Sequence, residues 1–483
     1  MSERAKRIAI DWVTEHERLL TDVHDKIWRW AEVGLQEVKT ARLLTEILER
    51  HGFKVERGVA GMPSAFVATY GSGKPVIGIM GELDALPGLS QKAVPWREPI
   101  VEGGPGHGCG HHGYATAALG GALAAKAAME EENLPGTIKC FGCPAEETLV
   151  GKVFMVRDGV FDGVDACLGH HPGSMNTARL GSGNAMNSVK FEFFGVAAHA
   201  AGSPHRGRSA LDAVELMNIG VNYLREHIVQ EARIHYVIED GGHEPNVVPA
   251  YARSWYYIRA PTRDLVEEYY ERVLRIADGA DLMAGTTHKV RFLTGVHNGI
   301  PNRTLAELIV GNMREIGAPT YNEEELEFAR ELAKSIPRKQ KIAMLRRLSE
   351  LIPDAMELMD VDLNDRIYDP FGEGRKGGGS SDVADVAWNT PTQQFSTTMF
   401  IVGSPGHSWQ NVASGGTSIG HKSSIFASKV MAATVIDLLT KPEVLRKAKE
   451  EWKRRMKGLT YKSPLPPDLK PPLDQLPPMP SEE

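Results

Sequence analysis

Hydrophobic residues in the first part of the chain alternate between helical spacing and short continuous runs. Residues 4–31 and 38–51 carry apolar side chains three or four positions apart, which predicts amphipathic helices. The run PVIGIM at residues 75–80 predicts a buried strand, followed by an alanine-rich helix over 114–131 and another strand over 136–142. Helices that alternate with buried strands are typical of an α/β fold, so we expect a mostly parallel sheet.

The pattern changes near residue 187, where a second kind of unit begins. Its predicted order is strand, helix, strand, strand, helix and strand, over residues 189–195, 209–226, 234–239, 252–260, 262–283 and 289–295. This βαββαβ order predicts a ferredoxin-like α+β domain whose helices cover one face of its sheet. We therefore expect a catalytic domain in two parts, 1–186 and 301–460, interrupted by an inserted lid domain, 187–300.

Three other segments lack this regular pattern. Residues 322–360 are highly charged and helical, which predicts an insertion of surface helices. Residues 372–381 (GEGRKGGGSS) predict a mobile glycine-rich loop. The proline-rich tail, 461–483, predicts an extended segment that lies on a partner.

Composition narrows the class of protein. A chain of 483 residues predicts two or three domains, and 42% hydrophobic with 24% charged residues is typical of a soluble globular protein. The net charge of −7 is spread without a basic stripe, which argues against nucleic acid or an anionic membrane as a partner. No apolar run of signal-peptide or membrane-spanning length follows the start, so we expect a cytoplasmic protein whose four cysteines form no disulfides.

The densest chemical signal is the segment GHGCGHHG at residues 106–113, which is followed by PAEE at 144–147. Cys109 and His111 stand two positions apart on a glycine-rich turn, so both side chains can face one zinc-like ion. Glu146 and Glu147 are adjacent after a predicted strand, so one can bind metal while the other takes a proton from water. Together the two motifs predict a metal-dependent hydrolase.

Two competing interpretations of these segments are weaker. Residues 108–113 also fit the dinucleotide-binding pattern GxGxxG, but no strand is predicted before them, and a phosphate cradle does not need cysteine or histidine. Cys140 and Cys143 form a CxxC pair, but no second pair completes a zinc site and the segment is predicted as a strand. We therefore favour the hydrolase.

Further candidates follow other predicted strands. Ligands bind at the carboxyl ends of strands in open α/β sheets, so we expect residues 82–84, 103–113, 144–147 and 170–171 to form one site. Asp84 is a candidate carboxylate for orienting a ligand histidine.

Several histidines compete for the remaining ligand positions. Either His170 or His171 could add one ligand, and His407 another, with His421 as its competitor. Most histidines in proteins are not ligands, and those on predicted helices are expected to face solvent: His16, His24, His51 and His227.

Taken together, these motifs resemble the dinuclear metal aminoacylase/carboxypeptidase family of zinc peptidases, in its amidohydrolase branch. The resemblance covers residues 10–440 and is carried by GELDALP, GHGCGHHG, PAEE, DACLGHHPG, GVAAHAAGSPHRGRSALDAVELMN, GGHEPNVVPAYARSWYYIRAP and GSPGHSWQ. The length, the NVVP motif and the GHSWQ segment are most similar to the p-aminobenzoyl-glutamate hydrolase subfamily. The resemblance implies a zinc-peptidase catalytic domain that hydrolyses the amide of an N-acyl or N-aroyl amino acid, an aryl-glutamate or a small dipeptide.

The resemblance also implies roles for particular residues. The implied ligands of two divalent ions, manganese or zinc with cobalt as a further option, are Cys109, His111, Glu147, His171 and His407. Glu146 is then the general base, and His199 in the lid polarises the scissile carbonyl, in its own site or in that of a partner subunit. Asn246 and Arg259 would hold a substrate carboxylate. The lid would also mediate a homodimer, or a heterodimer with a related subunit.

The chain departs from the common family pattern at two places. Most members have His-x-Asp where this chain has Glu-Leu-Asp at residues 82–84, and they bridge the metals with an aspartate where the amidohydrolase branch uses cysteine. The resemblance therefore implies that the Cys109 thiolate bridges. The branch loop usually has CGHDxH, whereas His112 follows His111 here, and this leaves the choice of metal open.

A rival function is a non-catalytic subunit that binds amino-acid conjugates, or a subunit that needs a partner for activity. A binding protein has no need of a general base beside its metal, so Glu146 favours an enzyme. A requirement for a partner stays open.

Overall fold

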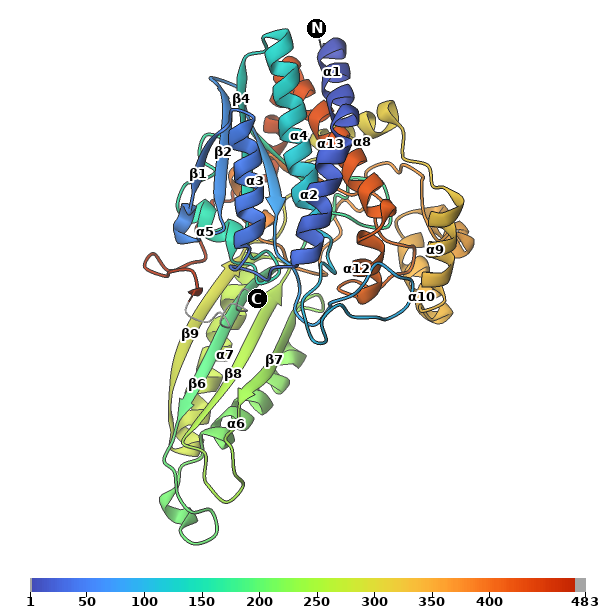
Figure 1. The fold of residues 1–483 in the computed structure, drawn as a ribbon. Helices are drawn as coiled ribbons and strands as arrows, with labels where there is room; N and C mark the ends of the chain where they lie inside the picture. The colour runs from blue at the N-terminus through green and yellow to red at the C-terminus, as the bar shows by residue number, and fades with distance from the viewer. Residues whose placement is uncertain (1, 474–483) are drawn as a thin grey trace.

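The computed structural model describes residues 2–473 and contains two separate β-sheets (Figure 1). A six-stranded sheet with helices packed around it lies in the upper part of this view, and a four-stranded sheet extends below it. The lower sheet belongs to one continuous segment, residues 185–296, which we call the inserted unit. The predicted α/β fold is confirmed.

The six-stranded sheet has the order β1-β2-β4-β3-β5-β10. The neighbours β4, β3, β5 and β10 are parallel, whereas β1 and β2 form an antiparallel edge. Because β3, β4 and β5 run in the same direction, their carboxyl ends meet at one edge of the sheet. The strands are β1 (Lys54–Arg57), β2 (Phe66–Ser72), β3 (Val76–Glu82), β4 (Gly136–Cys143), β5 (Ala166–His170) and β10 (Thr392–Phe395).

Alternate residues of this sheet face two apolar cores, as the pleat of a strand requires. One core joins the sheet to α1, α3, α4 and α13, and the other joins it to α5 and α11. The helices around the sheet are α1 (Ser2–Glu15), α2 (Glu17–Trp30), α3 (Val38–Arg50), α4 (His111–Glu132), α5 (Gly151–Arg157), α8 (Arg303–Ile316), α11 (Val383–Asn389), α12 (Trp409–Gly415), α13 (Ser418–Thr440) and α14 (Pro442–Arg455).

The CxxC pair lies on β4, with one thiol in each core. Cys140 belongs to the core with α4, and Cys143 belongs to the core with α5. Both cysteines are buried and unpaired. Two thiols on opposite faces of a sheet cannot hold one ion, so this geometry supports their interpretation as core residues.

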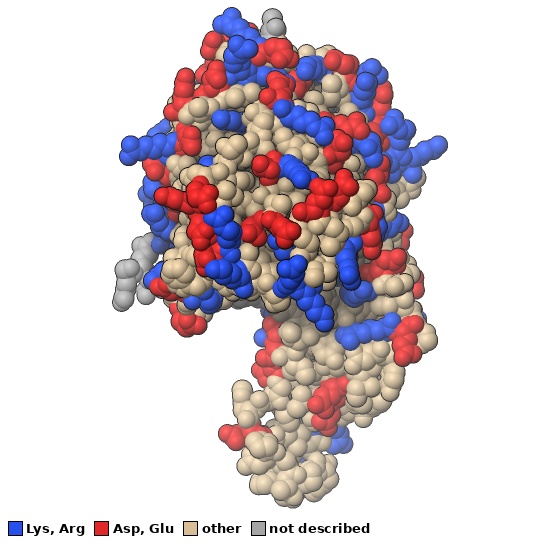
Figure 2. Space-filling model, turned by 90° about the vertical axis from the view of Figure 1, so that its right-hand side faces the viewer, with Lys and Arg blue, Asp and Glu red and all other residues tan. Residues whose placement is uncertain are grey.

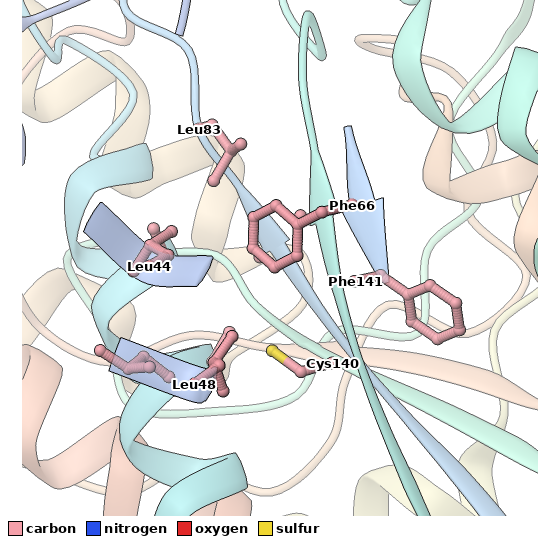
Figure 3. A pocket seen from close by; sticks show the side chains of 11 residues that line it. Leu44, Leu48, Phe66, Leu83, Cys140 and Phe141 are labelled. Atoms are coloured by element: carbon pink, nitrogen blue, oxygen red, sulfur yellow. The ribbon is translucent and has the colours of Figure 1, made fainter. Parts of the chain in front are cut away.

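Cys140 also borders a small apolar cavity between α3 and the sheet (Figure 3). The cavity has a volume of about 10 Å³, which is close to the space of a single water, and it offers no convergent polar groups. Its lining includes Leu44, Leu48, Phe66, Leu83 and Cys140. It is a packing defect of the core and not a ligand site.

Two long helical segments differ from the sequence-based expectation. The helix predicted over 4–31 is divided into α1 and α2 at His16, which has a non-helical backbone (φ −108°, ψ 19°). α13 is long and apolar enough to cross a membrane by length and composition, yet 89% of its apolar window is buried. It packs against α4 and α1, so its composition is that of a core helix.

The inserted unit has the predicted order of strands and helices. Its antiparallel sheet has the order β7-β8-β6-β9, and α6 and α7 share one core with it. The loops 196–208 and 241–250, with the short 3-10 helix η2 (Pro204–Arg206), form the end that lies farthest from the other sheet (Figure 1). The elements are β6 (Ala185–Phe194), α6 (Ala210–Leu224), β7 (Arg233–Asp240), β8 (Tyr251–Ala260), α7 (Arg263–Ala284) and β9 (Thr287–Val296).

The charged segment after residue 322 is helical, as predicted. It forms α9 (Glu323–Ala333), α10 (Arg338–Ser349) and the 3-10 helix η4 (Pro353–Asp360). On the face in Figure 2, Lys and Arg side chains are interspersed with Asp and Glu over the larger part of the molecule. This face therefore has no extended basic patch of the kind that nucleic acid would need.

The described part of the tail packs on this chain, and the expectation that it lies on a partner is wrong for residues 461–473. Leu465 is buried in the core with α5 and with Val296 of β9. The Arg157 guanidinium donates a hydrogen bond to the Leu469 carbonyl. These residues thus lie against the inserted unit and against α5, which packs on the six-stranded sheet, and residues 474–483 lie outside the described part.

Candidate metal centre

Candidate ligands converge where the parallel strands end. Asp84 follows β3, the Glu146-Glu147 pair follows β4, and His171 follows β5. Cys109 lies on the turn before α4, and His407 lies on the loop before α12. The topology therefore brings residues that are far apart in sequence to one edge of the sheet, as the strand-end rule predicts.

Cys109 lies between two groups of potential metal ligands. Its Sγ is 3.3 Å from His171 Nε2. Ligand atoms of Cys109, His111 and His171 all lie within 4.8 Å of one another, and so do those of Cys109, Glu147 and His407. The Nε2 of His407 is 3.4 Å from Glu147 Oε2. One thiol shared by two ligand groups is the arrangement expected for a bridging cysteine.

Asp84 orients two of these residues at once. Its Oδ1 lies 3.0 Å from His111 Nδ1, and its Oδ2 accepts a hydrogen bond of 2.9 Å from the backbone N–H of Glu147. The backbone carbonyl of Asp84 is also 3.0 Å from His111 Nδ1. A proton on Nδ1 satisfies both oxygens and leaves Nε2 of His111 free to bind a cation.

The free Nε2 of His111 faces several carboxylates. It lies 3.2 Å from Glu82 Oε2, 3.9 Å from Glu146 Oε2 and 4.0 Å from Glu147 Oε1. All four side chains are buried or nearly so. Several carboxylates in a desolvated space repel one another, and bound cations would stabilise them.

Burial shifts the protonation of the site. It raises the pKa of Glu146 to about 7, with the Glu82 charge adding to the effect, and it raises the pKa of Glu147 to about 8. Burial would lower the pKa of His111, but Glu82 and Asp84 hold it well above its usual value. Burial also raises the pKa of the Cys109 thiol to about 12, so a thiolate at neutral pH needs a cation beside it.

The residues fit a divalent metal in a further respect. His111 Nε2 and Glu147 Oε1 are buried and have no hydrogen-bond partner within residues 2–473. Buried polar atoms normally have a partner, and these two point at the same space. Thiolate, imidazole and carboxylate donors together suit zinc, manganese or cobalt.

Two backbone positions next to the ligands adopt the left-handed region. Ala145 has φ 53° and His407 has φ 52°, which is uncommon for residues other than glycine. A buried carboxylate supports the first position: Glu37 Oε1 accepts a hydrogen bond of 2.8 Å from the Ala145 N–H, and Glu37 Oε2 accepts one of 2.7 Å from Ser64. Such conformations concentrate at functional sites.

The structure shows which of the competing histidines lie at the Cys109 cluster. His170 Nε2 contacts Thr397 Oγ1 at 2.7 Å, and His421 Nε2 contacts Asp25 Oδ1 at 2.6 Å, so neither faces the Cys109 cluster. His171 and His407 do face it. The dinucleotide alternative gains no support, because β3 ends at Glu82 and a long loop precedes the glycine-rich turn.

The expectation that His24 faces solvent is wrong. The side chain is fully buried, with Nδ1 3.0 Å from Ser424 Oγ and Nε2 2.8 Å from the Gly415 carbonyl. It lies within 4.8 Å of ligand atoms of Asp25 and His421, but both of its ring nitrogens already have partners. This second group is therefore better explained as a buried hydrogen-bond network.

The inserted unit brings Arg259 toward this edge of the sheet, but not His199 or Asn246. Arg259, at the end of β8, has its guanidinium over the Tyr257 ring and 3.4 Å from Ser380 Oγ. Burial lowers the pKa of Arg259, while the charges of Tyr257 and Glu146 oppose this shift. His199 and Asn246 instead lie in the loops at the far end, where Ala200 N–H donates to the Asn246 carbonyl.

Residues that the sequence analysis did not single out also surround the site. Lys152 of α5 is fully buried between Glu82 and Asp382. The only sequence signal was a lysine inside an apolar run, GKVFMV, shortly after the PAEE motif. Glu37 gave no signal, because its role depends on the approach of a segment distant in sequence.

Comparison with known proteins agrees with this geometry. Residues 78–350 match Peptidase family M20/M25/M40. The chain belongs to this family. It is 40% identical over 476 residues to one of the subunits of p-aminobenzoyl-glutamate hydrolase from Escherichia coli (strain K12), and the match covers 96% of this chain and 98% of that protein. This M20/M25/M40 member is thus a hydrolase.

Solved structures of low sequence identity share the fold. An aminobenzoyl-glutamate utilization protein from Klebsiella pneumoniae has a TM-score of 0.60 at 18% identity, covering 88% of this chain and 97% of that chain. A Bacillus subtilis protein described as a dinuclear metal binding peptidase from the M20 family has a TM-score of 0.52 at 17% identity, covering 88% and 99%. The resemblance stated from the motifs is confirmed.

Proposed function

We propose that this M20/M25/M40 hydrolase cleaves the amide bond of an N-acyl or N-aroyl amino acid, with p-aminobenzoyl-glutamate as the first candidate. The observation that carries the proposal is Cys109, whose thiol belongs to two ligand groups beside a carboxylate, Glu146, that is available as a base. The name of the Escherichia coli relative supports the choice of substrate. Other aryl-glutamates and small dipeptides fit the same chemistry.

The proposed metal ligands are the members of the two groups around Cys109. His111 and His171 would complete one group, and Glu147 and His407 the other. Two divalent ions held there would lower the pKa of a water and polarise the substrate carbonyl. Manganese or zinc, and less typically cobalt, suits this mixture of soft and hard donors.

Glu146 is the proposed general base. Its buried carboxyl has a pKa of about 7, so near neutral pH it can both accept and return a proton. It takes the proton from the attacking water and then delivers it to the nitrogen of the leaving amine. Arg259 would bind a substrate carboxylate, and the effect of the Glu146 charge on its pKa supports this role.

A second subunit is part of the proposal. His199 and Asn246 lie at the far end of the inserted unit, and no contact joins them to the Cys109 cluster within residues 2–473. We infer that they complete the site of a partner, which is another copy of this chain or a related subunit. Exposed apolar residues on α6, Ile219 and Tyr223, are consistent with an interface on the inserted unit.

The second candidate function is a subunit that is inactive alone. The relative from Escherichia coli is named as one subunit of its enzyme, which favours a partner of another sequence. A cytoplasmic location is part of the proposal and is supported by four unpaired cysteines.

The experiment that tests the proposal combines metal content with hydrolysis of p-aminobenzoyl-glutamate by the purified chain. Activity that is lost with a chelator and restored by Mn²⁺ or Zn²⁺ is the expected result. Bound metal without hydrolysis would mean that the substrate is a different N-acyl amino acid or that a second subunit is missing. Metal-free protein that cleaves the substrate equally well would contradict the proposal.

A further inference from the structure

Lys152 lies in a fully buried ion network behind the metal centre. Its Nζ is 2.9 Å from Glu82 Oε1 and 2.7 Å from Asp382 Oδ1, and all three side chains have an exposed fraction of 0%. Asp382 Oδ2 also accepts a hydrogen bond of 2.7 Å from the Lys152 backbone N–H. The network therefore joins β3, α5 and the start of α11.

One positive and two negative charges leave this network with an excess of negative charge. Burying ions is costly, and the attraction within a pair offsets this cost only when each charge is compensated. The contacts of Lys152 Nζ are short enough for ion pairs, but Lys152 Nζ, Glu82 Oε1 and Asp382 Oδ1 have no hydrogen-bond partner within residues 2–473. Glu82 is thus held from one side while its charge is only partly compensated.

The second oxygen of Glu82 points to the metal centre. Glu82 Oε2 lies 3.2 Å from His111 Nε2, the nitrogen that Asp84 leaves free for a cation. It has no hydrogen-bond partner within residues 2–473. Ligand atoms of Glu82, His111 and Glu146 lie within 4.8 Å of one another, so the carboxylate can share an ion with His111.

We propose that Glu82 is an additional ligand of the metal centre and that Lys152 and Asp382 are positioning residues that hold its carboxylate toward the ion. The inference rests on the proposed metal site but not on the proposed substrate. Carboxylate oxygen is a harder donor than thiolate or imidazole, so Glu82 shifts the ion that it shares with His111 toward Mn²⁺. The network also connects that ion to the glycine-rich segment that precedes Asp382.

The test measures Mn²⁺ binding to the full chain at equilibrium, by competition with a chromogenic chelator, and not activity. Glu82→Gln removes the charge with little change in shape. We expect it to weaken the binding of one of two Mn²⁺ ions by at least about 10- to 100-fold, because altering even a residue that only orients a metal ligand has an effect of this size. Binding of the other ion stays close to that of the parent. Lys152→Met should weaken the same ion, because Glu82 then loses its anchor.

A matched control is Lys6→Met. Lys6 is also a buried lysine between two carboxylates, 3.3 Å from Asp437 and in contact with Glu315, but it lies on α1 away from the metal centre. This variant should lose thermal stability and keep both Mn²⁺ affinities. If Glu82→Gln does not fold, Glu82→Asp keeps the charge for Lys152 but is one methylene shorter, and we expect the same loss of one affinity.

The outcomes separate this inference from the proposed function. If the parent binds two Mn²⁺ ions and the Glu82 variants bind both with unchanged affinity, the role of Glu82 is overturned and the proposed function stands. If Lys152→Met behaves like Lys6→Met, the anchoring role of Lys152 is overturned. A parent chain that binds no divalent metal overturns both proposals. If the Glu82 variants selectively lose one ion and the parent does not cleave p-aminobenzoyl-glutamate, the role of Glu82 is supported and only the proposed substrate is contradicted.

Discussion

Asp84 Oδ1 lies 3.0 Å from His111 Nδ1, and both side chains are buried. The aspartate thereby fixes which nitrogen of the imidazole is available to a cation. The same carboxylate accepts the Glu147 N–H, so one side chain sets the positions of two proposed ligands.

Asp84→Asn should weaken metal binding about 10- to 100-fold without removing any ligand. The asparagine amide accepts hydrogen bonds through its single oxygen, so it cannot serve both His111 Nδ1 and the Glu147 N–H equally well. It also lacks the negative charge that stabilises His111. Equilibrium titration with Mn²⁺ measures the effect. Asp165→Asn is the control, since Asp165 pairs with Lys74 and Lys449 away from the site. Equal affinities in the two variants would contradict the orienting role.

Glu146→Gln should reduce hydrolysis by about 10²- to 10⁴-fold and leave metal content unchanged, because the amide cannot accept a proton. Steady-state kinetics with metal analysis check this result. Glu56→Gln, on the exposed face of β1, should behave like the parent.

The pH profile of the parent follows from the same carboxyl group. Burial raises the pKa of Glu146 to about 7, so the fraction of carboxylate falls as the pH falls through this value. Bound cations favour the carboxylate and move the midpoint lower. We expect kcat to decline on the acid side with a midpoint at or below about 7. A rate that rises on acidification would rule out Glu146 as the base.

Two cysteines allow a matched comparison. Cys109→Ser should lose bound metal, because a serine hydroxyl is a poor substitute for a bridging thiolate. Cys140→Ser should keep the metal and lose about 1–3 kcal/mol of stability, because its hydroxyl enters an apolar environment without a partner. Metal analysis and chemical denaturation of both variants test this. Retention of two ions by Cys109→Ser would refute the bridging role.

His24 should make the fold sensitive to acid. Burial lowers the pKa of His24 to about 4, whereas an unfolded histidine titrates near 6.5. Between these values the unfolded chain binds more protons, so stability is present above about 6.5 and is lost as the pH falls, by at most about 3 kcal/mol. His24→Gln should show a smaller drop in Tm between neutral pH and about pH 4.5. His227→Gln, at an exposed site, should show the parental drop.

A mixing experiment tests the role of His199 across subunits. Glu146→Ala and His199→Ala chains should each be nearly inactive alone. If His199 acts in the partner's site, a mixed dimer has one intact site, and an equal mixture should recover about a quarter of the parental activity after exchange of subunits. No recovery, with mixed dimers verified by tagged chains, would contradict this arrangement.

The elements that the sequence predicts well are those whose pattern is local. The predicted order of strands and helices in residues 185–296 is correct, and β8 shows the alternation of buried and half-buried residues that one covered face produces. Cys109, His111 and the PAEE motif are recognisable because a tight glycine turn and adjacent glutamates are unusual in a purely structural loop. The residue pattern alone left His170 and His171 as alternatives, and the family resemblance implied His171. In the structure His171 contacts Cys109 while His170 contacts Thr397, since adjacent residues on an extended segment point to opposite sides.

The residues that escaped prediction depend on contacts between distant segments. His24 is surrounded by charged neighbours in sequence, and only the approach of α13 and α4 buries it. Lys152 has apolar neighbours, but its partners come from the end of β3 and from the segment before α11. No periodicity within one element encodes such partners. The sequence pattern around a charged residue therefore does not show which distant residues will contact it in the folded protein.

The path of residues 461–473 has a consequence for synthesis on the ribosome. Tyr461 donates a hydrogen bond of 3.0 Å to Asp385, and Leu465 enters the core that also contains Val296 and Val153. These contacts link the inserted unit to the helices α5 and α11 that pack on the larger sheet, and they form only after nearly the whole chain has emerged. Because domains tend to fold as units in the order of translation, this segment adds its contacts last, to two units that also meet through Thr294 and the Leu149 carbonyl. A chain whose translation stops near residue 460 would lack these additional contacts between the two units.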